Sequence, residues 1–442
     1  MSLPVRTWFL AAAVLLAAAV AAPSAFAAKG MEIGVQDDAQ FLSSVPSARA
    51  AAFAQARRLG VTALRANVAW ARVAPDAQSP VAPVAPVYDL SAYDRLVDEA
   101  AASGIHVQLT LAGPAPAWAT ADHAISADHP DPARFGEFAG AVAAHFAGRV
   151  RALSIWNEPN WYGLLEPETI CGQVAQKAKP VKGKKGAKGK TKQGAAGGKA
   201  KGGNGHGGGG GSGGGKAKGS RAVRRKLCVK TSARVYRGLY QAGYAAIKAA
   251  SPSTPVWMGE TNPYVNRRKQ STAPLAWLRQ LACVDGVVKG CTGTLKADGY
   301  AHHPYAFDRN PASARSGPDD VTIATLGRLR KQLAKLRPRI VIAHGAIYLT
   351  EFAYYSSGPN AKPEKKRAAW TRKAFEIALK AAAVRQLVYY QLIDPPATET
   401  WRTGLITAGG AQHAAFGALQ KFAVKRRKAL AQPHPFALPA AH

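Results

Sequence analysis

The sequence is poor in acidic residues, in cysteine and in long apolar runs. Its 442 residues include 26 Asp and Glu against 59 Lys and Arg, a formal net charge of +33. After the first thirty residues no segment is apolar enough to cross a bilayer, which excludes a polytopic membrane protein. The four cysteines are too few for a disulfide-rich scaffold and too widely spaced for a zinc site, so no metal is expected.

The chain begins with the layout of a secretory signal peptide over 1–27. Arg6 precedes an apolar stretch at 8–22, and small residues follow at Ala25 and Ala27. This pattern predicts export with cleavage after Ala27. The alternative is an uncleaved membrane anchor, but the apolar stretch is short for a span of ~20 residues. We expect a secreted monomer without stable membrane insertion, folded over 28–430 and ending in a tail at 431–442.

Export places the four cysteines in an oxidising compartment, where disulfides form. Cys283 and Cys291 are close in sequence, and Cys171 and Cys228 bracket a segment of unusual composition. We predict the disulfides Cys171–Cys228 and Cys283–Cys291, although four cysteines allow three pairings.

The bracketed segment, 172–226, is basic and glycine-rich. It contains sixteen Lys and Arg and no Asp or Glu. Such a composition cannot bury a core, so we predict a disordered insertion. Its charge favours an anionic wall polymer or an acidic polysaccharide as a partner, and a merely solvated insertion is the alternative. It has no aromatic residues to stack on bases, which argues against a nucleic-acid partner.

Apart from this insertion, short apolar segments alternate with amphipathic ones. Eight such units predict a closed (β/α)8 barrel, with the insertion between the fourth strand and the fourth helix. A doubly wound open sheet is the alternative, but no Gly-rich phosphate turn follows the first strand. The expected strands are 31–36, 62–70, 106–113, 151–157, 255–259, 298–303, 346–352 and 385–392. The expected helices are 47–60, 91–104, 132–148, 232–250, 273–282, 323–336, 366–383 and 413–424.

Polar residues stand at the carboxyl ends of several expected strands, where barrel enzymes build their sites. Glu158 ends the fourth strand and Glu351 the seventh, so two carboxylates face each other across the barrel mouth. Glycosidases need such a pair, one to protonate the leaving oxygen and one to attack the anomeric carbon. Glu260, on the fifth strand, remains ambiguous, and we expect His302 to be structural.

The segments SIWNEPN (154–160) and LTEFAYYSS (349–357) resemble the signature of the retaining (β/α)8 glycoside hydrolases that include families 5 and 39. The resemblance covers about residues 31–425 apart from the insertion. It implies that Glu158 is the acid/base, Glu351 the nucleophile, and Asn157 a ligand of the sugar 2-hydroxyl. It further implies that no cofactor is needed, and that three residues support the nucleophile: Arg65, His303 and Tyr305.

The eighth strand departs from that signature. Many relatives end it with a tryptophan, whereas this sequence has Tyr390 and Gln391 there. We expect Gln391 to bond a sugar hydroxyl, with Trp161 and Trp401 as stacking surfaces. The sequence thus predicts a secreted glycosidase acting on a carbohydrate by a retaining mechanism. A catalytically silent carbohydrate- or wall-binding barrel is the alternative.

Overall fold

The computed structural model describes residues 30–175, 224–266, 268 and 270–431. The predicted signal peptide, most of the predicted insertion and nearly all of the tail lie outside these residues. The expectations of export and of polymer binding by 172–226 therefore stay predictions. Within the described residues, no helix has both the length and the apolar composition needed to cross a membrane.

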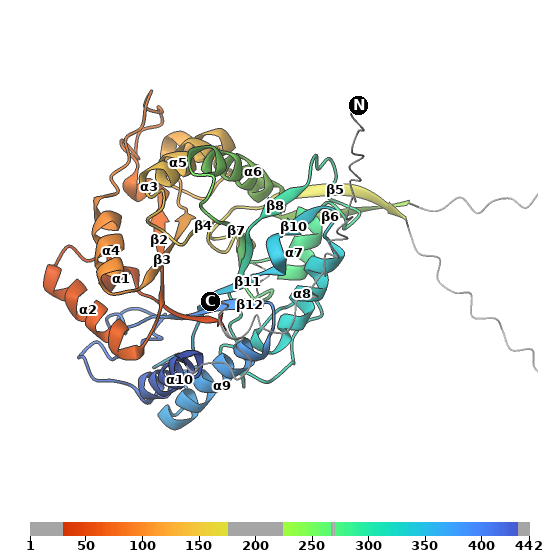
Figure 1. The fold of residues 1–442 in the computed structure, drawn as a ribbon. Helices are drawn as coiled ribbons and strands as arrows, with labels where there is room; N and C mark the ends of the chain where they lie inside the picture. The colour runs from red at the N-terminus through yellow and green to blue at the C-terminus, as the bar shows by residue number, and fades with distance from the viewer. Residues whose placement is uncertain (1–29, 176–223, 267, 269, 432–442) are drawn as a thin grey trace, which may run out of the picture.

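Eight parallel strands close into a barrel, which confirms the predicted fold (Figure 1). Their side chains are buried almost throughout, as expected of strands enclosed by helices. Around the barrel the order is β1-β12-β11-β9-β7-β4-β3-β2. The strands are β1 (Glu32–Gln36), β2 (Ala63–Ala69), β3 (His106–Ala112), β4 (Ala152–Ile155), β7 (Val256–Thr261), β9 (Gly299–His302), β11 (Ile347–Phe352) and β12 (Val384–Tyr390).

A ring of helices surrounds the barrel (Figure 1). Local chemistry explains their ends: Asp131 caps α5 by accepting from the amides of Ala133 and Arg134, and Gly60 ends α2 with a φ of 83°. The main helices are α2 (Pro46–Leu59), α4 (Ser91–Ala102), α5 (Pro132–His145), α6 (Ala233–Ala250), α7 (Pro274–Leu281), α8 (Leu326–Lys335), α9 (Glu364–Lys380) and α10 (Ala414–Ala431). Shorter helices are α1 (Asp38–Phe41), α3 (Trp70–Val73), η2 (Ala117–Ala119), η3 (Ile323–Thr325) and η4 (Ala343–Gly345).

Two small sheets were not expected from the sequence. The antiparallel pair β5 (Glu168–Ala175) and β6 (Arg224–Thr231) projects from the barrel, and β8 (Leu295–Ala297) pairs in parallel with β10 (Ile340–Ile342). The first pair includes both ends of the predicted disordered insertion, so 172–175 and 224–226 are strand residues. Of the predicted insertion, residues 176–223 lie outside the described part of the chain.

Both predicted disulfides are present. Cys171 and Cys228 face each other in the β5–β6 register, with their Cα atoms 4.0 Å apart. Cys283 and Cys291 close a short loop, with Cα atoms 6.0 Å apart. The first disulfide fixes the base of the insertion beside the loop that follows β4, where the Tyr162 hydroxyl donates to the Lys230 carbonyl over 2.8 Å.

The two disulfides should differ in their effect on stability. Cys171–Cys228 spans 57 residues and Cys283–Cys291 spans 8, and chain-entropy arguments give roughly 4 and 2.5 kcal/mol respectively. We expect the variant Cys171→Ser/Cys228→Ser to lose more free energy of unfolding than Cys283→Ser/Cys291→Ser in urea titrations. The opposite ranking would show that the β5–β6 pair unfolds independently of the barrel.

Candidate active site

Six barrel strands bring a polar cluster together near one mouth of the barrel, five of them at their carboxyl ends and β2 through Arg65, its third residue. All six residues expected there from β2, β4, β9 and β11 belong to it, and β1 and β7 each add one more. The cluster comprises Gln36, Arg65, Asn157, Glu158, Glu260, His303, Tyr305 and Glu351.

Arg65 joins four of these strands through a fully buried guanidinium group. Nη1 donates to Glu351 Oε1 over 2.7 Å and to the side chain of Gln36. Nη2 donates to Glu260 Oε2 over 2.7 Å and to Asn157 Oδ1 over 2.8 Å. Because a guanidinium group only donates, Arg65 fixes the Asn157 amide with its oxygen inward. The NH₂ group of Asn157 has no hydrogen-bond partner among the described residues and can donate to a ligand.

Glu351 is held by donors on both of its oxygens. Arg65 occupies Oε1, and the Tyr305 hydroxyl donates to Oε2 over 2.9 Å. Burial, and then the charge of Glu351, raise the pKa of Tyr305 well above its ordinary value, so the phenol stays a neutral donor. Both contacts orient the Glu351 carboxyl group.

Glu158 stands opposite, on a backbone that has left the strand. Its φ is 42°, and its amide donates to the Glu260 carbonyl over 3.0 Å. Glu260 also has a positive φ, 51°, so two strained residues support each other at the ends of β4 and β7. The side chain of Glu158 contacts His303 Nδ1 at 2.9 Å and accepts from Asn262 Nδ2 over 3.2 Å.

Glu260 is the residue whose importance the sequence left open. It is fully buried and contacts Arg65 and, at 2.9 Å, His303 Nε2, which in turn contacts Glu158. Burial alone would raise its pKa, but Arg65 and then His303 outweigh that effect and lower it to about 2. It also accepts from Gln108, Thr110 and Thr350. The one available signal was its position at a strand end, shared with Glu158 and Glu351.

The two adjacent histidines have opposite environments. Burial lowers the pKa of His303, but Glu351, Glu158 and Glu260 outweigh it and raise that pKa to about 9. His302 points the other way, to Thr261 Oγ1 and the Val321 carbonyl at 2.9 Å each, and burial lowers its pKa to about 3. The alternation of side chains at a strand end separates their roles, as expected.

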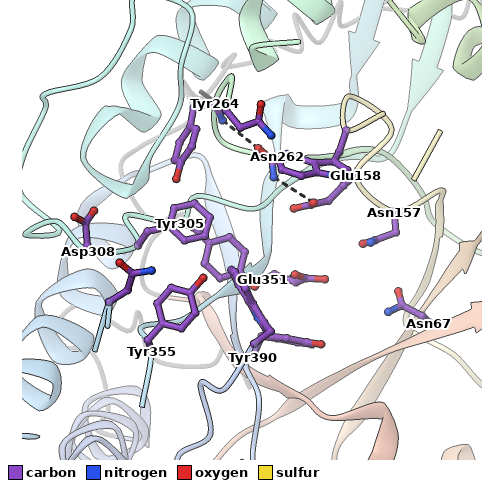
Figure 2. Close-up of a pocket in the computed structure, with 15 residues that line it drawn as sticks. Asn67, Asn157, Glu158, Asn262, Tyr264, Tyr305, Asp308, Glu351, Tyr355 and Tyr390 are labelled. Carbon is purple, nitrogen blue, oxygen red and sulfur yellow. Dashed lines mark hydrogen bonds between the residues drawn. The ribbon is translucent and has the colours of Figure 1, made fainter. Parts of the chain in front are cut away.

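A cavity of about 620 Å³ lies over the cluster (Figure 2). Trp161 and Trp401 line it, as predicted from the sequence, whereas Gln391 is not among the described residues that do. Its neighbour Tyr390 lines the cavity instead, and Gln391 accepts from Thr403 Oγ1 over 3.4 Å. The lining also includes residues that the sequence did not single out: Asn67, Asn262, Tyr264, Asn266, Phe307, Asp308, Tyr355 and Asn360.

Glu158, His303 and Glu351 are the one group in the described chain with donor atoms close enough for a cation, all within 4.8 Å of one another. A metal would need a neutral imidazole here. The raised pKa of His303 and the charge of Arg65 oppose that requirement. The arrangement is better suited to proton transfer than to metal binding.

Comparison with known proteins gives structural matches alone: no family model and no curated protein matches the chain. A family 39 glycoside hydrolase from Bacteroides cellulosilyticus aligns with a TM-score of 0.54 at 17% identity, covering 90% of this chain and 64% of its own. A GH5_18 protein from Streptomyces cattleya, in complex with GlcNAc, aligns with a TM-score of 0.54 at 14% identity, covering 92% and 82%. This chain has the barrel fold of glycoside hydrolase families 5 and 39. It spans less than two thirds of the Bacteroides protein.

The raised pKa of His303 predicts stability that is lost at alkaline pH. The folded state favours the protonated ring, so the contribution is complete below about pH 6.5 and is lost as pH rises through about 9. The shift corresponds to roughly 3 kcal/mol. We expect urea titrations to show a fall in unfolding free energy between about pH 7 and 10 that is smaller in His303→Gln. Identical pH profiles for the two proteins would refute the charged imidazole.

Glu260 should matter for stability more than a surface carboxylate does. Glu260→Gln leaves Arg65 and His303 short of a buried counter-charge, so we expect a loss of about 3 kcal/mol or more in unfolding free energy. The matched control is Glu376→Gln, which breaks an exposed pair with Arg372 and should cost less than about 1 kcal/mol. Unfolding free energy is measured by thermal and urea denaturation. Equal losses for Glu260→Gln and Glu376→Gln would contradict a stabilising role of the buried cluster.

Proposed function

We propose that the protein is a glycoside hydrolase that cleaves O-glycosidic bonds with retention of configuration. The observation that carries the proposal is the placement of Glu158 and Glu351 at the ends of β4 and β11, with an oxygen of each within 4.8 Å of the other. Retaining enzymes keep their two carboxyl groups about 5–5.5 Å apart, whereas inverting enzymes leave a wider gap for water.

Glu351 acts as the nucleophile in this mechanism. Arg65 and Tyr305 hold it at the edge of the cavity, where it attacks the anomeric carbon. Glu158 gives its proton to the departing oxygen as that bond breaks. Asn157 directs its free NH₂ group to a sugar hydroxyl, because Arg65 occupies its carbonyl oxygen.

Glu158 then changes role. With the leaving group gone, it takes a proton from an incoming water, whose oxygen displaces Glu351 from the anomeric carbon. His303 bonds Glu158 at 2.9 Å and stands beside this proton throughout. A sugar hydroxyl in place of water would give transglycosylation by the same steps.

The site of action follows from separate observations. The two disulfides suit an oxidising compartment, and the predicted signal peptide supplies the route. We therefore place the proposed activity outside the cell.

Replacement of either carboxylate should abolish most activity, but in different ways. We expect Glu351→Gln to lower kcat by about a thousandfold or more on every glycoside. Glu158→Gln should be equally impaired on natural linkages yet retain more activity on aryl glycosides with acidic leaving groups, which need no protonation. Steady-state kinetics on both substrate types measure the contrast.

The control for these variants is Glu137→Gln, on the outer surface of α5, where Glu137 pairs with Arg134. It should leave kcat unchanged. Near-normal turnover in Glu158→Gln or Glu351→Gln would refute the assignment. A wild-type protein that binds glycans and releases no product would instead be the silent carbohydrate-binding barrel.

A further inference from the structure

The barrel mouth holds a second cavity, of about 800 Å³, beside the one over the catalytic pair. The first cavity is lined mainly by residues that follow β4, β7, β9, β11 and β12, and the second by residues that follow β1, β2, β3 and β4. Asn67 and Asn157 line both. Figure 2 shows these two residues together at one edge of the first cavity, opposite Asp308 and Tyr355.

The boundary between the cavities presents polar groups that lack partners. Asn67 donates through Nδ2 to Asp38 over 3.1 Å, but its buried Oδ1 has no hydrogen-bond partner among the described residues. Asn157 has its NH₂ group free, as described above. Buried polar groups nearly always have hydrogen-bond partners. A ligand with hydroxyl groups on both sides of this boundary would supply the missing partners of Asn67 and Asn157.

The two cavities differ in the surfaces they offer. The first is lined by seven aromatic side chains, among them Trp161 and Trp401, which suit the flat faces of sugar rings. Among the described residues of the second, Tyr93 is the one aromatic, and half of the lining side chains are polar or charged. A chain of sugars could stack in the first cavity and form hydrogen bonds in the second.

Charge gives the clearest indication of the ligand. Asp38, Asp122, Asp128 and Glu166 line the second cavity, against the single cation Arg72. The first cavity adds Glu158, Asp308 and Glu351, and its described lining has no Lys or Arg. Arg65 and His303 offset the charge of Glu158 and Glu351, so the excess negative charge comes mainly from the second cavity. Among the described residues, no Lys or Arg forms an ion pair with Asp122, Asp128 or Glu166. The mouth is thus negative in a protein of net charge +33, and such a cleft concentrates or repels ligands by sign.

We infer that the substrate is a glycan chain without anionic groups that lies across both cavities and is cleaved at an internal bond. This inference rests on the proposed function. Asn67 and Asn157 bind the sugars at the junction, and the second cavity binds those beyond it. Polyuronic chains are attracted to the basic exterior and repelled from the mouth, whereas neutral and amino-sugar chains are admitted.

Chain-length kinetics test the two-cavity part. The wild-type protein is assayed on aryl glycosides and on di- to hexasaccharides from neutral, amino-sugar and uronic series. We expect kcat/KM to rise with length and products to come from internal bonds. Hydrolysis of an aryl glycoside, with only terminal sugars released from oligosaccharides at a length-independent rate, would overturn the inference and leave the proposed function intact. Failure to hydrolyse any of these glycosides would refute both the two-cavity inference and the proposed function.

A bulky side chain placed in the second cavity tests the role of that cavity independently of Glu158 and Glu351. Ala127 lines that cavity, and Ala121, exposed on the same loop, does not. We expect Ala127→Trp to reduce kcat/KM for the hexasaccharide about tenfold more than for the aryl glycoside, and Ala121→Trp to change neither. Equal effects of Ala127→Trp on both substrates would show that the second cavity binds no sugar.

Charge removal tests the substrate class. In the variant Asp128→Asn/Glu166→Gln, uronic hexasaccharides should bind better at low salt, with Glu137→Gln as the control. The gain should be about two- to fivefold per charge removed, measured as kcat/KM where they are cleaved and as inhibitor affinity where they are not. Neutral hexasaccharides should respond far less. Wild-type cleavage of a uronic hexasaccharide as efficiently as a neutral one would overturn the exclusion of anionic chains.

Discussion

The site depends on one buried cation. Arg65 reaches Gln36, Asn157, Glu260 and Glu351, which come from four different parts of the barrel wall. A buried guanidinium group without counter-charges would be prohibitively costly, so the two carboxylates must stay where they are. The contacts that stabilise the buried charge also orient Glu351, the proposed nucleophile, and the Asn157 amide, the proposed sugar ligand.

Charge balance then explains how so many ionisable groups can lie together in the barrel. Three carboxyl groups, Glu158, Glu260 and Glu351, face two cations, Arg65 and His303. The two cations therefore offset two of the three carboxyl groups, and the cluster buries no large excess of charge of either sign. Glu260, with its pKa lowered to about 2, stays ionised and holds both cations below the reaction centre.

Much of the fold could be predicted because its signals are local. Apolar spacing along each segment identified the eight strands and eight helices, and the strand ends indicated Arg65, Glu158 and Glu351. The β5–β6 pair was missed because it includes both ends of the basic, glycine-rich insertion and its pairing joins residues distant in sequence, Glu168 and Thr231. Glu260 was left open because its partners Arg65 and His303 are distant in sequence. Gln391 was preferred to Tyr390 because a shift of one residue at a strand end reverses which side chain faces the cavity.

The most direct test of the central claim is covalent trapping. The protein is incubated with a panel of 2-deoxy-2-fluoro glycosides, and the labelled peptide is identified by mass spectrometry. The account predicts a glycosyl group on Glu351, lost in Glu351→Gln and retained in the control Glu137→Gln. A label on any other side chain, or turnover of these glycosides with inverted configuration, would contradict it.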